Sequence, residues 1–292
     1  MGYKQGMGSR IFDILNYAFM LALVVVMVYP LLNVISLSLS DPDYIALGEV
    51  SWWPKGFNTK GYEIILSKPQ LYISYRNTLL YASVGTLLTL LLTSLTAYPL
   101  TVADFPLKKF ITIFLAITMF FGGGMIPTYL LMKELHLLNT FWIMVIPGSV
   151  GAFNVFIYRS FFQNIPSELR ESALMDGAGD ITILFRIYLP LSKALLATFA
   201  LFSIVAFWNE WFNALIYLKN ESKYPLQMFL RSLIVDDGSA SSQYRNLLVN
   251  NEVNPKNIVM AAIVIALAPI LCIYPFVQKH FVKGAMVGSI KG

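Results

Sequence analysis

Residues 171–190, ESALMDGAGDITILFRIYLP, form a polar stretch between two long apolar segments. The stretch contains Glu171, Asp176, Asp180 and Arg186. Because charged side chains are costly inside a bilayer, we expect it to lie outside the lipid. A helix surrounded only by water and lipid headgroups would need neither two glycines nor this pattern of acids. The stretch therefore predicts docking onto a partner.

The composition of the whole chain indicates a membrane protein. Of its 292 residues, 57% are hydrophobic and 13% are charged, whereas roughly a quarter are charged in soluble domains. A membrane-spanning helix needs about 20 apolar residues. The sequence predicts an all-α membrane protein in which the first span is retained rather than cleaved as a signal peptide. The six predicted transmembrane helices lie within residues 14–277, at 14–36, 73–98, 110–132, 141–158, 191–217 and 258–277.

The positions of Lys and Arg predict the orientation in the membrane, because cytoplasmic loops are enriched in them. The excess of Lys and Arg over Asp and Glu falls on the side of the membrane that holds the N-terminal segment 1–13. The tail 278–292 contains Lys but no Asp or Glu. Both termini and the connection 159–190 are therefore expected in the cytoplasm. The outer connections are 37–72 and 218–257, the second with a polar run typical of a flexible loop. The net charge of +5 follows from this topology and gives no reason to expect nucleic-acid binding.

The inner connection contains signals for a short helix over residues 167–176. Ser167 is suited to the N-cap position. Gly177 suits the left-handed turn that ends many helices. Leu169 and Ala173 are four residues apart and share a face, and Pro190 is expected to begin the next span.

The spacing in this connection resembles the cytoplasmic coupling loop of bacterial ABC importer permeases, which reads Glu-Ala-Ala, three residues, Gly, nine residues, Ile-x-Leu-Pro. Ser172 in place of Ala is the one departure. The run at 121–124 is similar to a subset of permeases that import oligosaccharides delivered by a lipoprotein binding protein. Five other segments resemble the carbohydrate-uptake branch of this family. They are Met125-Ile126-Pro127-Thr128-Tyr129, Leu138-Asn139-Thr140, Phe207-Trp208-Asn209, Pro225-Leu226-Gln227 and Phe281-Val282-Lys283-Gly284.

The resemblance implies a type I ABC importer permease in the bacterial cytoplasmic membrane. Its implied partners are a homologous second permease, two ATPase subunits and an extracytoplasmic binding protein that the outer loops would contact. The helix would sit in a groove on an ATPase subunit, where Glu171 would pair with a basic residue. ATP and Mg would bind those ATPase subunits. The resemblance also assigns Gly177 to the turn that lets the helix lie flat, and Leu169 and Ala173 would supply apolar contact. The residues predicted to take part in this coupling are Leu169, Glu171, Ala173, Asp176, Gly177 and Pro190.

The chain itself is not expected to hydrolyse ATP or to bind a cofactor. No Gly-Lys dipeptide occurs in the sequence, so the phosphate-binding pattern G-x-x-x-x-G-K-[ST] is absent. No metal site is predicted either, because His136 has no second histidine nearby and a metal needs several such ligands. The single cysteine, Cys272, excludes a disulfide within the chain.

Two groups of residues are candidates for the translocation path. Gly122, Gly123 and Gly124 interrupt the third predicted span and suggest either a broken helix that lines a cavity or close helix packing. Glu210 is an acid inside the fifth span and therefore a functional candidate. The neighbours that could face the path with it are Asn209 and Trp211, although aromatic residues also gather at membrane interfaces.

Three other interpretations remain to be compared with the importer permease. A secondary transporter would need coupling-ion acids within its spans, and Glu210 is the one clear candidate. A permease for a solute other than a carbohydrate would share the same coupling loop. A membrane sensor would need a soluble signalling domain, which the sequence does not show. The row Thr86, Thr89, Thr93 and Thr96 lies on one helix face and is expected to join helices rather than bind substrate.

Overall fold

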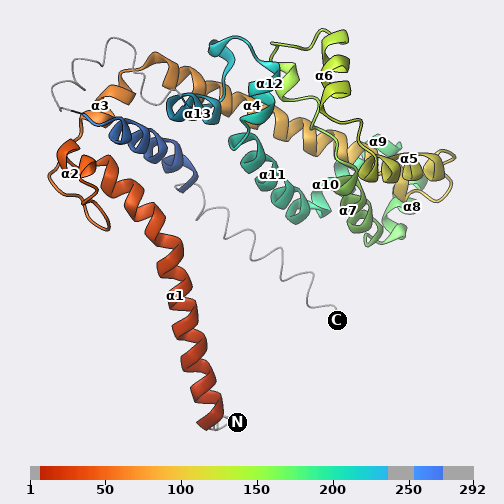
Figure 1. The fold of residues 1–292 in the computed structure, drawn as a ribbon. Coiled ribbons are helices and arrows are strands. Elements are labelled where there is room, and N and C mark those ends of the chain that lie inside the picture. Colours follow the sequence, from red (N-terminus) through yellow and green to blue (C-terminus); the bar gives the residue numbers. More distant parts are fainter. Residues whose placement is uncertain (1–6, 236–252, 272–292) are drawn as a thin grey trace. The chain divides into compact units, whose positions relative to one another are not determined.

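The computed structural model describes residues 7–235 and 253–271, which are helical apart from turns and one isolated bridge between Ser40 and Phe57. The chain divides into two compact units (Figure 1). The first combines Met1–Pro69 with Ser232–Ile270, and the second combines Gln70–Arg231 with Leu271–Gly292. The tail 278–292, Cys272 and the polar run in the second outer connection lie outside the described residues.

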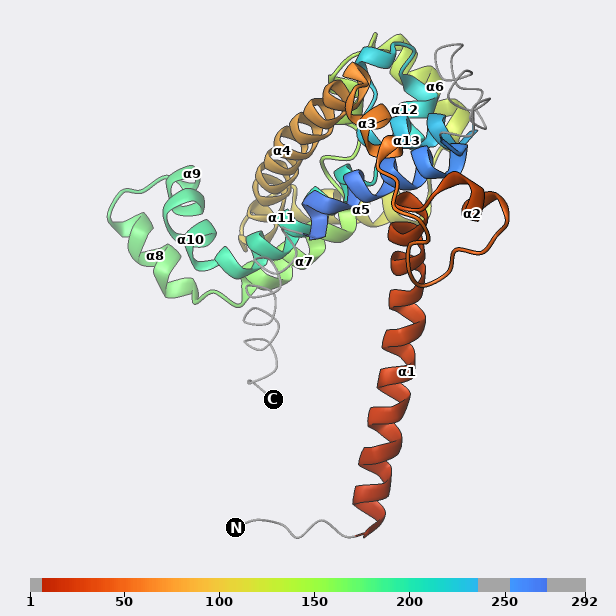
Figure 2. The same cartoon turned by 90° about the vertical axis from the view of Figure 1, so that its left-hand side faces the viewer.

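The first unit contains the long helix α1 (Met7–Ser38), which extends from the short helices α2 (Pro42–Ala46) and α3 (Lys60–Leu66) (Figure 2). The apolar window of α1 is 0% buried within the chain. A helix that is apolar on all sides and uncovered by its own chain fits a membrane span. The structure therefore confirms a helix over the predicted segment 14–36 that is long and apolar enough to cross a membrane.

A buried amide fastens the first outer connection to a later helix of the same unit, Pro255–Leu271. The Asn257 side chain is buried, and its Nδ2 donates to the carbonyl oxygens of Leu37 and Ser40 at 2.9 Å each. Gly61 lies so close that a Cβ there would be 3.0 Å from the Asn257 carbonyl oxygen. The end of α1 is therefore held to a segment more than 200 residues away in sequence.

The second unit is arranged along the 29-residue helix α4 (Pro69–Ala97). Three threonines of the predicted row, Thr86, Thr89 and Thr93, are buried, as expected for a face that joins helices. The helices that follow are η1 (Pro99–Thr101), α5 (Lys108–Phe120), α6 (Met125–Glu134), η2 (Trp142–Met144), α7 (Ala152–Gln163), α8 (Ser167–Met175), α9 (Asp180–Ile183), η3 (Leu184–Tyr188), α10 (Leu189–Leu191), α11 (Lys193–Trp208), α12 (Phe212–Tyr217), η4 (Glu221–Lys223) and α13 (Leu226–Val235).

Among the described residues, two helices are long and apolar enough to cross a membrane, Gly8–Ser38 and Pro69–Thr101. A third crossing results if Asp180–Leu191 and Lys193–Trp208, which meet at 83°, form one bent span. The apolar helix Pro255–Leu271 covers the described part of the last predicted span. The six-span count and the cytoplasmic termini stay predictions.

The other predicted spans are interrupted at residues that weaken helices. The segment 110–132 is divided between α5 and α6 at residues 121–124, where Gly124 has φ +81°. The segment 141–158 is irregular around Pro147, and α7 begins only at Ala152. Glycine and proline reduce helix stability by about 1 and 3 kcal/mol relative to alanine, so apolarity alone overestimates helix length here.

Two groups of buried apolar side chains form the interior of the second unit. One, around Tyr81, Ile143 and Tyr217, packs α4 against η2 and α12. The other joins the end of α4 to α7, α9, η3 and α11. In this second group Tyr158 packs edge-on against Phe199 with ring centroids 4.9 Å apart. The stretch 171–190 contributes Ile183, Leu184 and Tyr188 to this group, which therefore anchors the stretch to the rest of the unit.

Candidate functional site

The polar stretch begins within helix α8, which ends in a Schellman motif. Gly177 has φ +80°. Its N–H donates to the Leu174 carbonyl at 3.0 Å, and the Ala178 N–H donates to the Ala173 carbonyl at 2.9 Å. These two bonds satisfy carbonyls that a helix end leaves without partners. The predicted helix and its glycine terminator are therefore present, with the last helical residue one position earlier than expected.

Replacing Gly177 with alanine is expected to destabilise this turn, whereas replacing Gly179 is not. A left-handed conformation costs a residue with a Cβ about 1–2 kcal/mol, and neither glycine has an atom within 4 Å of its Cβ position. Gly179 has φ −77°, which alanine adopts freely. The measurement is the midpoint of thermal unfolding of the purified protein, where a loss for G177A of several degrees beyond that of G179A is expected. Equal midpoints would contradict the role of Gly177.

The start of α8 differs from the prediction. Ser167 is the first helical residue rather than the N-cap, which is Pro166, and no side chain caps this end. Glu168 lies in the first turn as expected, where a carboxylate interacts favourably with the helix dipole.

The predicted docking residues separate into an outward and an inward group. Leu169 and Glu171 are exposed, and within the described residues Glu171 makes no hydrogen bond or ion pair. Asp176 is exposed at the C-cap of α8. Ala173 instead packs against the chain's own core, together with Ala178. Its methyl group therefore serves to seat α8 on the bundle, which the four-residue spacing did not reveal.

Two exposed apolar residues on α8 were missed by the sequence reasoning. Leu174 is 40% exposed and Met175 is 89% exposed. They lie at the end of α8, whereas Leu169, which is 42% exposed, lies near its start. The signal was an apolar pair that only Asp176 separates from the helix-terminating glycine. An exposed methionine is a flexible contact for a partner surface.

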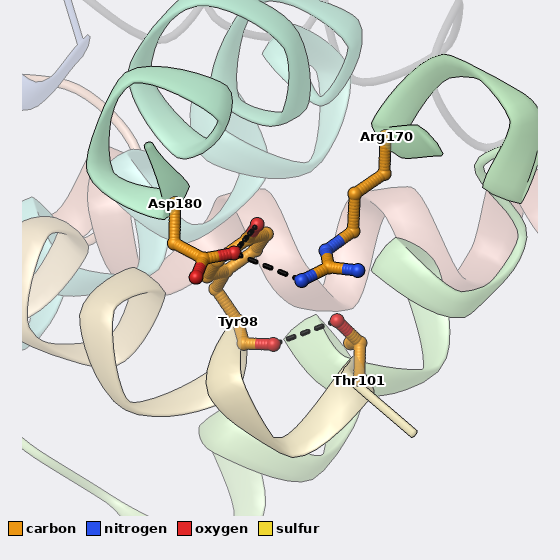
Figure 3. Close-up of polar contacts among 4 residues, drawn as sticks. All are labelled: Tyr98, Thr101, Arg170 and Asp180. Carbon is orange, nitrogen blue, oxygen red and sulfur yellow. Dashed lines mark hydrogen bonds and ion pairs between the residues drawn. The ribbon is translucent and has the colours of Figure 1, made fainter. Parts of the chain in front are cut away.

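A polar cluster joins α8 to the end of α4 (Figure 3). The Tyr98 hydroxyl donates to Oδ1 of Asp180 at 2.8 Å, and the same oxygen accepts from Nη2 of Arg170 at 3.1 Å. Burial lowers the pKa of Arg170, but its contacts with Tyr98 and Asp180 outweigh burial and raise it overall. The guanidinium therefore stays charged. The Thr101 hydroxyl donates to the Tyr98 carbonyl at 2.6 Å and fixes the backbone turn below.

The Arg170–Asp180 pair adds little to stability. The Asp180 side chain is 59% exposed and that of Arg170 is 24% exposed. Water and salt screen such a pair, so its contribution is at most about 1 kcal/mol. The rigid member is Tyr98, whose ring is buried and packs edge-on against Tyr188 with centroids 4.9 Å apart.

The chain returns toward α11 through a π-helical turn, η3, and not through a regular helix that starts at Pro190. Pro190 lies in the short helix α10, and the 83° bend falls between α10 and α11, after Leu191. Proline has no N–H to donate, and single π turns form where the regular hydrogen-bond ladder is disturbed. Pro190 therefore marks the bend rather than the start of the span.

Among the path candidates near residue 210, Glu210 caps the start of α12. Both carboxylate oxygens of Glu210 accept from Asn213, one from its backbone N and one from Nδ2, at 2.9 Å each. Asn209 donates to the Val205 carbonyl. The guanidinium of Arg231 lies 4.4 Å from the centroid of the Trp211 ring. Glu210 thus has a structural task at the start of α12, and any role in the path would come in addition.

The glycine candidates lie in the break between α5 and α6. Neither Gly122 nor Gly124 has an atom within 4 Å of its Cβ position, and for Gly123 the nearest is Cβ of Pro127 at 3.7 Å. Within the described residues they are therefore not sites of close helix packing. They are exposed backbone at a broken helix.

At the other end of α4, polar side chains hold the segment 219–226. The Asn77 amide donates to the carbonyls of Ser222 and Tyr224 at 2.8 and 3.1 Å. The Tyr81 hydroxyl donates to the Lys223 carbonyl at 2.8 Å. This beginning of the second outer connection is therefore ordered, whereas the polar run that was predicted to be flexible lies outside the described residues. Further bonds of the same kind join Gln70 to Glu221 and Thr78 to Leu226.

Asn139 fastens this segment to the turn after α6. It has φ +55°, which asparagine tolerates better than most residues. Its Oδ1 accepts from the backbone N–H groups of Lys219 and Asn220 at 3.2 Å each, and its own N–H donates to the Tyr217 carbonyl at 2.9 Å. The first half of α4 thus holds this loop through Asn77 and Tyr81. Tyr98, which follows the last residue of α4, belongs to the polar cluster at α8.

A family model described as the inner membrane component of binding-protein-dependent transport systems matches residues 3–287. This chain belongs to that family. The family assignment confirms the resemblance to ABC importer permeases and places the chain in the inner membrane, where its apolar helices fit.

Relatives of this inner membrane component cover almost its whole length. The polygalacturonan/rhamnogalacturonan transport system permease protein YtcP of Bacillus subtilis (strain 168) is 37% identical over 98% of this chain and 100% of its own. Protein LplC of the same organism is 40% identical over 97% of this chain and 96% of its own. A chain in the crystal structure of a bacterial ABC transporter involved in the import of the acidic polysaccharide alginate has a TM-score of 0.91 and is 32% identical. That match covers 96% of this chain and 100% of the other, so the inner membrane component has the helical type I ABC permease fold.

Proposed function

We propose that this inner membrane component forms half of the pore of an ATP-driven importer that takes up oligosaccharides delivered by an extracytoplasmic binding protein. The observation that carries the proposal is the match in sequence and fold along nearly the whole chain to permeases of carbohydrate transporters. The other half of the pore would be a homologous permease, and two ATPase subunits would supply the energy. ATP and Mg would bind those subunits, because this chain lacks a phosphate-binding loop.

Helix α8 is the part that would dock on the ATPase. Its exposed side chains include Glu171 for an ion pair and Leu169, Leu174 and Met175 for apolar contact. The cap at Gly177 and the inward methyl of Ala173 would set the angle at which the helix leaves the bundle. This division of tasks agrees with a helix that must move as a unit with a partner.

The substrates to test first are oligosaccharides that carry carboxylates. The relative YtcP is named for polygalacturonan and rhamnogalacturonan, and the alginate transporter for an acidic polysaccharide. In this chain Arg231 stacked on Trp211 offers a guanidinium beside an aromatic face. Guanidinium binds carboxylate through two parallel hydrogen bonds, and aromatic faces suit the apolar patches of sugar rings. Glu210, Asn209 and the glycines 122–124 would line or gate the same path.

Coexpression with the products of neighbouring genes tests the proposal. We expect a tag on this chain to copurify an ATPase and a second permease. We also expect the complex in proteoliposomes to take up labelled oligogalacturonate only with ATP and the binding protein. Maltooligosaccharide of equal length is the neutral comparison. Transport by this chain alone on an ion gradient would instead support a secondary transporter, and uptake of a non-carbohydrate solute would refute the substrate class.

A further inference from the structure

One carboxylate oxygen of Asp180 is shared by two elements that the sequence separates widely. Tyr98 follows α4, and Arg170 lies in the middle of α8, yet both donate to the same Oδ1 atom, at 2.8 and 3.1 Å. Asp180 itself begins α9. The side chains of the three residues converge on one point in Figure 3. The cluster therefore ties together the end of α4, the helix α8 and the start of α9.

The two sides of this cluster differ in how firmly they are held. Tyr98 is 4% exposed, and its ring packs against Tyr188, which in turn packs edge-on against Phe162 with centroids 5.5 Å apart. Helix α8 has no buried residue, and its one partly buried apolar side chain that packs against the core is Ala173. Its position relative to α4 therefore depends on the bonds at Asp180 as well as on that one methyl.

We propose that Asp180 is a positioning residue that links displacement of α8 to α4. The inference rests on the proposed function, in which α8 moves with an ATPase subunit. A displacement of α8 would move Arg170 and, through its ion pair, the Asp180 carboxylate. The hydrogen bond from Tyr98 to that carboxylate would transmit the displacement to the end of α4. An exposed ion pair contributes little to folding, so its removal should leave the protein folded while loosening this link.

Asp180→Asn and Tyr98→Phe test the proposal in the assembled complex. Asparagine keeps the shape of Asp180 but removes its charge, and phenylalanine keeps the ring that packs on Tyr188 but removes the hydroxyl. We expect both complexes to assemble and to keep basal ATP hydrolysis. The increase in hydrolysis caused by the loaded binding protein should fall about fivefold or more, the lower range of coupling between two sites. Asp180→Glu, which keeps the carboxylate, should recover part of it.

A double-mutant comparison separates positioning from a general loss of charge. If Arg170 and Asp180 act as one unit, Arg170→Gln together with Asp180→Asn should reduce stimulation no more than either change alone. Asp104→Asn is the matched control, because Asp104 is also exposed and, within the described residues, makes no hydrogen bond or ion pair. It should leave stimulation unchanged.

Unchanged stimulation in both Asp180→Asn and Tyr98→Phe, with normal assembly, would overturn the positioning role and leave the proposed function intact. Additive losses in the double variant would also overturn it. If the unaltered chain itself copurified no ATPase, the proposed function would fail instead. The ratio of stimulated to basal hydrolysis is the decisive readout, because a variant that was only unstable would lower both rates together.

Discussion

Replacing Glu171 with lysine is expected to abolish ATP-driven uptake while leaving this chain folded. The side chain is exposed on α8 and makes no hydrogen bond or ion pair within the described residues, so the fold does not depend on it. At the proposed ATPase interface, truncating one partner of a buried charge pair costs about 2–5 kcal/mol, and reversing the charge adds repulsion. Uptake into proteoliposomes and copurification of the ATPase measure the effect.

The neighbouring acid of α8 provides the control for this prediction. Glu168 lies in the first turn, where its carboxylate interacts with the helix dipole for about 0.3–1 kcal/mol. We expect Glu168→Gln to keep most of the uptake and Glu171→Gln to lose most of it. Normal uptake by Glu171→Lys would show that α8 does not use this carboxylate for docking.

Replacing Gly85 with leucine is expected to prevent correct folding of the second unit. A Cβ at Gly85 of α4 would lie 2.2 Å from Cζ of Phe207 in α11 and 2.7 Å or less from the adjacent ring carbons. The ring therefore occupies the space of a side chain. Overpacking a well-packed core costs about 1–3 kcal/mol even for small additions, and leucine adds three more carbons. The expected result is loss of monodisperse protein in size-exclusion chromatography.

A second-site change should relieve this clash. Gly85→Ala alone is expected to lower the thermal midpoint, and Phe207→Leu in the same chain should recover part of the loss by making room for the methyl group. Gly8→Ala is the comparison, because Gly8 lies in helix α1 and has no atom within 4 Å of its Cβ position. Equal stability of the Gly85→Ala and Gly8→Ala variants would mean that the two helices do not approach through this glycine.

Local signals predicted the docking helix well. The glycine at 177 and the acid in the first turn depend on backbone conformation and on the helix dipole, which act over a few residues. The helical spans at 14–36 and 73–98 were predicted for a similar reason, since each is a long apolar run without glycine clusters or a strong break. Pro30 lies within α1 without ending it.

Predictions that required knowledge of neighbours were less accurate. Ala173 was assigned to a partner because it shares a face with Leu169, but its methyl packs inward. Pro190 was expected to start a span, yet it lies in the short helix α10, which follows a π-helical turn, and a sharp bend separates α10 from α11. Which side of a short helix is covered depends on segments distant in sequence, and periodicity contains no information about them.

The sequence by itself determined the class of this protein and the location of helix α8. Composition indicates a membrane protein, and the spacing from Glu171 through Gly177 to Pro190 resembles that of a coupling loop, because both signals depend on residues close together along the chain. Only the tertiary structure decided how that loop is attached. Tyr98 and Asp180 are 82 positions apart, and the hydrogen bond between them exists because the core around Tyr188 brings the end of α4 beneath α8.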